Sequence, residues 1–158
     1  DGTALDGTRL QLPAELPARR TLVLLAFRQR QQAQVDRWTA RAVAELGIPA
    51  TTLGLAADAP TAVIEVPCLG RRWRPARRVI DGGMASSIAD PAILARTVTV
   101  YADVGAILRA LGATGPALVQ ARVVERSGAV CAAGSGEPEG AGWQAIADAL
   151  SAPTAPPR

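Results

Sequence analysis

The residues best suited to chemistry in this chain are a run of arginines around one tryptophan. Arginine forks bind phosphate and carboxylate groups, and a neighbouring indole stacks or lies at an interface. The run therefore predicts a site for phosphate, anionic lipid headgroups or an acidic partner. The alternative interpretations are a solvated loop and arginine stems that cover apolar surface. This arginine cluster (residues 71–78) contains Arg71, Arg72, Trp73, Arg74, Arg77 and Arg78.

The two cysteines are the next candidates. Cys68 lies just before the arginine cluster. That electropositive setting favours a thiolate, and with it a role in one-cysteine redox or adduct chemistry. The simpler interpretation, which we favour, is an ordinary loop thiol. Cys131 stands among small apolar residues of a predicted strand, which is typical of a buried structural cysteine.

Several kinds of chemistry are excluded by what the sequence lacks. The chain has no histidine, which removes the usual general base at neutral pH and the commonest metal ligand. Two cysteines alone cannot assemble a structural zinc site. Asp81, Asp90 and Asp103 each fit a turn or a helix cap. We therefore expect no metal, no cofactor and no acid–base pair.

The positive charge of the chain is local. The formal net charge is +3, and subtracting the five arginines of the cluster leaves −2 for the rest. All basic residues are arginine, which is typical of a GC-rich coding sequence, and we expect a bacterial origin. With 3% aromatic residues and no motif that reads nucleic acid, binding to DNA or RNA is disfavoured.

The length of 158 residues suits one domain. We expect an extended arm or hairpin over 1–16, a domain over 17–150 and a flexible Pro/Ala-rich tail over 151–158. The longest apolar run, residues 22–27, is too short to cross a bilayer. A first residue other than Met fits a trimmed chain or an exported protein after signal-peptide removal, so we expect a periplasmic or otherwise extracytoplasmic location.

Hydrophobic periodicity predicts an α/β fold. Helices between strands imply crossovers, a parallel core and a mixed sheet with helices on both faces, to which a C-terminal hairpin adds antiparallel pairing. The predicted elements are a central strand at 21–27, a helix at 31–46, a strand at 61–66, an irregular segment with a helical turn at 69–89, a brief helix after Asp90, a strand at 97–101, a helix capped by Asp103, a hairpin of 117–125 with 129–133, and a helix at 141–150.

The order of these elements resembles the thioredoxin-like superfamily, especially its periplasmic thioredoxin-related and peroxiredoxin-like branch. The resemblance implies a three-layer sandwich in which Pro116 is cis and faces the loop after the central strand. It also places Arg28, Gln29, Arg30 and Gln32 where redox members carry thiols, so this second surface would bind a peptide or an anion without chemistry. The matching pieces are 5–16, the strand ending in Phe27, Gly115-Pro116, Arg126-Ser127-Gly128 and Gly134-Ser135-Gly136.

A narrower similarity lies in residues 79–84, 88–90 and 96–103. These segments resemble the thioredoxin-fold family of mitochondrial ATP synthase assembly factors and its bacterial relatives. The resemblance implies a non-catalytic assembly factor, chaperone or scaffold subunit that binds a protein partner. Two alternatives stay open: a one-cysteine thiol oxidoreductase or peroxidase at Cys68, and peripheral binding of anionic lipid or phosphate through the arginine cluster.

Overall fold

The computed structural model describes residues 1–49 and 59–153; the last part of the predicted tail, 154–158, lies outside them. Short 3-10 helices precede two of the α-helices. The elements in chain order are β1 (Gly2–Ala4), β2 (Arg9–Leu10), β3 (Arg20–Ala26), η1 (Gln29–Gln31), α1 (Gln32–Leu46), β4 (Thr61–Gly70), η2 (Arg71–Ala76), α2 (Arg77–Ser86), α3 (Pro91–Arg96), β5 (Val98–Ala102), α4 (Val104–Ala110), β6 (Gln120–Glu125), β7 (Val130–Ser135) and α5 (Gly140–Ser151).

The described strands form one mixed sheet in the order β2-β1-β5-β4-β3-β6-β7. The central strands β3, β4 and β5 are parallel, and β6 and β7 add the C-terminal antiparallel hairpin. At the other edge, the predicted N-terminal hairpin is present, and its strand β1 pairs with β5. The predicted α/β class with a parallel core is therefore confirmed.

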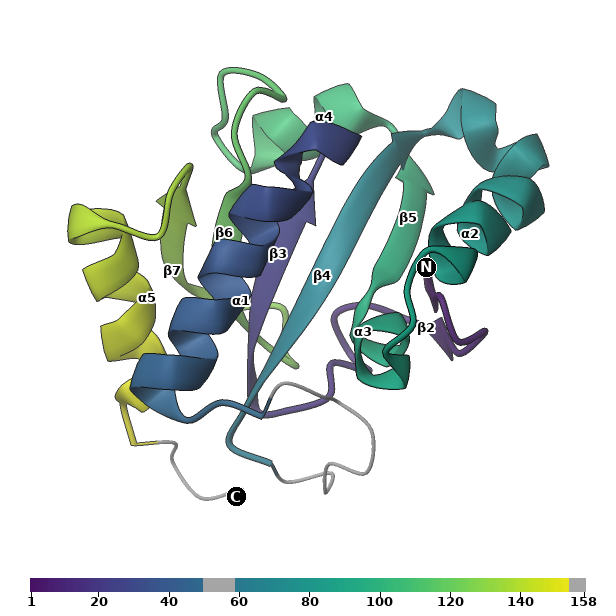
Figure 1. The fold of residues 1–158 in the computed structure, drawn as a ribbon. Helices are drawn as coiled ribbons and strands as arrows, with labels where there is room; N and C mark the ends of the chain where they lie inside the picture. The colour runs from purple at the N-terminus through teal and green to yellow at the C-terminus, as the bar shows by residue number, and fades with distance from the viewer. Residues whose placement is uncertain (50–58, 154–158) are drawn as a thin grey trace.

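Helices cover both faces of the sheet. Figure 1 shows α1 crossing in front of β3, with α5 beside it toward β7. Trp38 and Trp143 of these helices lie 5.9 Å apart between ring centres, and the buried Trp38 indole donates to the carbonyl of Gly136 at 2.8 Å. On the opposite face, Ile107 of α4 packs against a core that includes Leu16. The apolar positions that recur at helical spacing in α5 are buried. Those of α1 are buried at Val35, Trp38 and Ala42 but only half-buried at Val43 and Leu46.

The face that carries α1 also contains a buried ion pair. Arg96, the last residue of α3, donates from Nε to Oε1 of Glu65 in β4 at 2.8 Å. The two residues are only 7% and 3% exposed. Gln32, at the start of α1, donates to the other Glu65 oxygen at 3.2 Å. Glu65 therefore joins α1, α3 and the centre of the sheet.

The segment after β4 differs from its prediction. The predicted strand ended before Pro67, yet β4 continues to Gly70. The pairing of β4 with β3 ends at Pro67, and its pairing with β5 begins at Cys68, after a single parallel bridge between Glu65 and Thr97. Pairing with β5 therefore carries the strand past the proline. The predicted irregular segment is mostly helical, since η2 and α2 occupy residues 71–86.

The three aspartates assigned to turns or caps divide into two groups. Asp90 and Asp103 cap α3 and α4, accepting from the backbone N–H of Ala92 and Ala106. Asp81 instead lies within α2 and accepts the hydroxyl of Tyr101 at 2.7 Å, so its assignment to a turn was wrong. No helix in the described ranges has the length and apolar character needed to cross a membrane.

Candidate functional site

A groove of about 620 Å³ opens at the carboxyl edge of the three parallel strands. Phe27 follows β3, Gly70 ends β4 and Ala102 ends β5, and all three line the groove. Ligands of open α/β sheets bind at this edge because the loops after neighbouring parallel strands converge there. The fold therefore places this groove where a binding site is expected.

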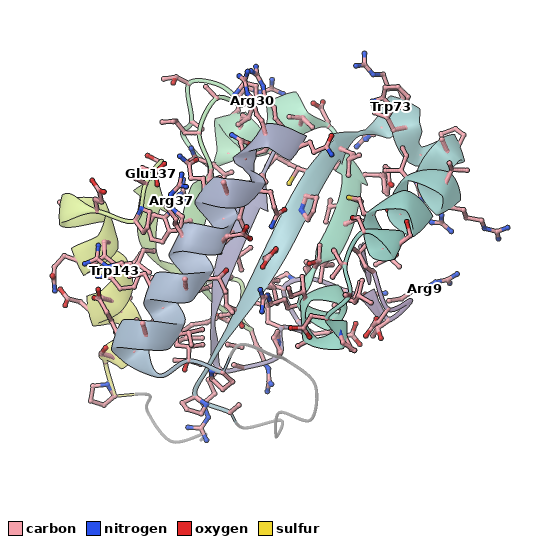
Figure 2. The ribbon with its side chains drawn as sticks, viewed as in Figure 1. Arg9, Arg30, Arg37, Trp73, Glu137 and Trp143 are labelled. Carbon is pink, nitrogen blue, oxygen red and sulfur yellow. The ribbon has the colours of Figure 1, made fainter. Side chains whose placement is uncertain are left out.

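The groove unites the two surfaces proposed from the sequence. Arg28 and Pro116 come from the surface implied by the resemblance, and Arg71, Arg72 and Trp73 come from the arginine cluster. Trp73 is 49% exposed, and the Arg72 guanidinium lies 5.4 Å from the centre of its ring. Figure 2 shows Trp73 and Arg30 toward the same end of the molecule, whereas Arg9 lies away from it.

The other predicted site residues lie outside the groove lining. Gln29 and Arg30 are exposed on the turn that enters α1. The side-chain amide of Gln32 donates hydrogen bonds to the carboxylates of Asp36 and Glu65. Among the remaining arginines of the cluster, Arg74 lies in η2, and Arg77 and Arg78 begin α2. None of the three lines the groove.

Gln31 is the important residue that sequence reasoning missed. Its Oε1 accepts the backbone N–H groups of Phe27 and Arg28 at 2.7 and 2.9 Å, and its Nε2 donates to the carbonyl of Pro116 at 3.1 Å. The side chain is 4% exposed. Gln31 thus ties the turn after β3 to the loop that carries Pro116. The sequence carried one signal for this role: a polar side chain at the start of a helix can form hydrogen bonds with the backbone of its own turn.

Pro116 itself departs from the expectation. The cis X-Pro bond among the described residues is Leu12–Pro13, and the bond before Pro116 is trans. The proximity of Pro116 to the turn after β3 is nevertheless present, through the hydrogen bond from Gln31. The expected cis geometry was therefore wrong, while the expected juxtaposition is confirmed.

The charge of the groove is positive. Its lining carries three guanidinium groups, at Arg28, Arg71 and Arg72, against the single carboxylate of Asp103. A backbone hydrogen bond from Ala106 lowers the pKa of Asp103, helped by the charges of Arg109 and Arg71. The lining therefore favours anionic ligands, and its carboxylate is kept ionised rather than poised to transfer a proton.

The cysteines differ from their predictions. Cys68 is buried in β4 at the base of the groove and is not a loop thiol; its sulfur lies 3.4 Å from the carbonyl of Val66. Burial raises the pKa of Cys68 to about 12, so the expected effect of the nearby arginines is overridden. Cys131 is exposed rather than buried, because β7 is the edge strand of the sheet.

We expect the two thiols to react at very different rates with the reagent dithionitrobenzoate. Near pH 8, a pKa of about 12 leaves only about one Cys68 in ten thousand as thiolate. Cys131 should therefore account for the fast phase, and Cys68 should react only after unfolding. The Cys131→Ser variant should lose the fast phase and the Cys68→Ser variant should keep it. Fast labelling of native Cys131→Ser would contradict this assignment.

Comparison with known proteins is informative at the level of the fold. No protein-family model matches the sequence, and no curated protein matches it. The exposed lipoprotein thioredoxin Etrx1 of Streptococcus pneumoniae aligns over 94% of this chain and 95% of its own, with 12% identity and a TM-score of 0.53. The fold is thioredoxin-like.

A second solved structure agrees with this result. The N-terminal domain of PilB from Neisseria gonorrhoeae aligns over 95% of this chain and 87% of its own, with 10% identity and a TM-score of 0.55. At such low identity the likeness concerns the architecture. In this chain, the turn after β3 reads Arg28-Gln29-Arg30-Gln31-Gln32 and contains no cysteine.

Proposed function

We propose that this thioredoxin-like protein is a non-catalytic binding module that holds an acidic segment of a protein partner in the groove. The observation that carries the proposal is the convergence of Arg28, Arg71, Arg72, Trp73 and Pro116 on one groove at the carboxyl edge of β3, β4 and β5. Guanidinium groups form bidentate hydrogen bonds with carboxylates, and an exposed indole adds apolar contact area. An assembly-factor or scaffold role, acting outside the cytoplasm, belongs to the same proposal.

The properties of the two cysteines are the reason why the proposed function includes no thiol chemistry. Cys68 lines the groove but is 4% exposed, and burial holds its pKa near 12. Cys131 lies on β7, away from the groove lining. A thiol that acts as a nucleophile needs both exposure and thiolate character. Neither cysteine combines these properties at the groove.

We expect a fluorescent hexaglutamate peptide to bind this protein at low salt and to bind more weakly as salt rises. Reversal of two groove charges, in Arg71→Glu/Arg72→Glu, should weaken binding at least about tenfold, which corresponds to about 1.4 kcal/mol. Fluorescence anisotropy measures the affinity. The matched control is Arg9→Glu/Arg37→Glu, which makes the same change in net charge at two exposed arginines outside both the groove lining and the arginine cluster.

The control separates the groove from the overall charge of the protein. If both double variants lose affinity equally, the peptide senses only net charge and the groove proposal is wrong. Emission from Trp73 gives a second readout, because Trp38 and Trp143 are 0% and 4% exposed whereas Trp73 is 49% exposed. A bound peptide should protect Trp73 from the quencher acrylamide.

Contact with an anionic membrane surface is the second candidate function. No residue of η2 or α2 is buried, and Trp73 and Val79 are 49% and 78% exposed among the five arginines of the cluster. Basic segments with exposed apolar side chains lie at membrane interfaces. Val79 does not line the groove. The variant Val79→Asp should therefore abolish sedimentation with phosphatidylserine vesicles and leave peptide binding unchanged.

A further inference from the structure

A second pocket lies on the far side of the loop that carries Pro116. Its volume is about 470 Å³, and it is lined by residues 111–115, 117 and 118 and by residues of β6 and β7. Its walls include the apolar side chains of Leu111 and Leu118 and the polar side chains of Gln120 and Ser135. The one charged residue of its lining is Arg122. A pocket of this size suits a small molecule.

Arg122 is held at the base of the sheet by neutral acceptors. Its Nη1 donates to the carbonyls of Ala121 and Gly134 at 2.8 and 3.0 Å. Its Nη2 donates to the carbonyl of Leu111 at 2.8 Å and to Oε1 of Gln120 at 3.2 Å. These bonds fix the guanidinium between the loop and the hairpin, so the charge cannot swing out into solvent.

The charge of Arg122 has no carboxylate partner among the described residues. All four acceptors are uncharged, and the residue is only 7% exposed. Burial lowers its pKa, with no neighbouring acid to offset the effect. Buried charges in proteins are normally paired, because an uncompensated charge in a low-dielectric setting is unfavourable. An anion in the adjoining pocket would supply the missing charge.

We propose that this second pocket binds a small organic monocarboxylate. The carboxylate lies near the Arg122 guanidinium, whose Nε–H is not engaged by the four hydrogen bonds described. The apolar body of the ligand packs against Leu111 and Leu118, of which Leu118 is 47% exposed. The combination of one fixed cation with apolar walls selects an acid with a hydrophobic body over an inorganic anion.

Calorimetric titration with benzoate tests this site, with benzamide as the uncharged analogue of the same shape. Benzoate should bind and raise the midpoint of thermal unfolding, and benzamide should do neither. The decisive variant is Ala133→Glu. Ala133 is exposed and lies directly opposite Arg122 in the register of β6 and β7, so the new carboxylate supplies the counter-charge. Benzoate affinity should fall at least tenfold.

The matched control is Val130→Glu, which adds the same charge to an exposed position of the same strand outside the pocket lining. It should bind benzoate as the unchanged protein does. Arg122→Gln should lose benzoate binding, and circular dichroism checks that it folds; Ala133→Glu leaves Arg122 intact and tests the site even if Arg122→Gln does not fold.

Three results would overturn the proposal: no benzoate binding, equal binding of benzamide, or equal loss of affinity in both glutamate variants. Hexaglutamate binding should be the same in Ala133→Glu and in the unchanged protein, because Ala133 does not line the groove. The two sites are thus tested separately.

Discussion

Replacement of Arg96 by methionine should lower the free energy of unfolding by about 3–5 kcal/mol, because it leaves a buried carboxylate without its partner. Glu65 is 3% exposed and accepts from Arg96 at 2.8 Å. In the variant, Gln32 remains as a neutral donor at 3.2 Å. Urea denaturation followed by circular dichroism measures the loss.

A double variant shows how much of that loss comes from the orphaned charge. In Glu65→Leu/Arg96→Met both ionic groups are replaced by apolar ones, and most of the lost stability should return. The matched control is Arg37→Met, which breaks the Arg37–Glu137 pair of 2.7 Å at the surface. Both partners are well exposed there (Figure 2), so the change should be much smaller. Equal losses in Arg96→Met and Arg37→Met would contradict the argument.

The parts of the fold that depend on local pattern were predictable from the sequence. The spacing of Trp38 in α1 and of Trp143 and Ile146 in α5 identified the buried helix faces, and all three side chains are buried. The parts that depend on strand partners were not. The extension of β4 through Pro67 depends on its pairing with β5, which continues after the pairing with β3 has ended. The exposure of Cys131 depends on the edge position of β7.

In the candidate site, too, the local sequence pattern predicted the residues but not how strand pairing brings them together. The residue types of Arg71, Arg72 and Trp73 marked a binding surface, and the resemblance to thioredoxin-like proteins marked Arg28 and Pro116. Their union in one groove depends on β3 and β4 running parallel and ending at the same edge of the sheet. Sequence spacing does not show this, because residues 28, 72 and 116 are far apart along the chain.

Gln31→Ala should remove about 2–4 kcal/mol from the free energy of unfolding, because it leaves two backbone donors and one carbonyl without their partner. The donors belong to Phe27 and Arg28, and the carbonyl to Pro116. The turn and the loop lose their connection, so the amides of Phe27 and Arg28 should exchange faster with deuterium. Hexaglutamate affinity should fall as well, since Arg28 and Pro116 both line the groove.

Two neighbouring substitutions distinguish a role in positioning from a general loss of polarity. Gln29→Ala alters an exposed side chain of the same turn and should change neither stability nor peptide affinity measurably. Gln31→Glu keeps an acceptor for the two backbone N–H groups but loses the donor to Pro116. Its amides at Phe27 and Arg28 should stay protected while peptide affinity falls, because the Pro116 loop is released. If Gln31→Ala binds the peptide as the unchanged protein does, the groove does not need this connection.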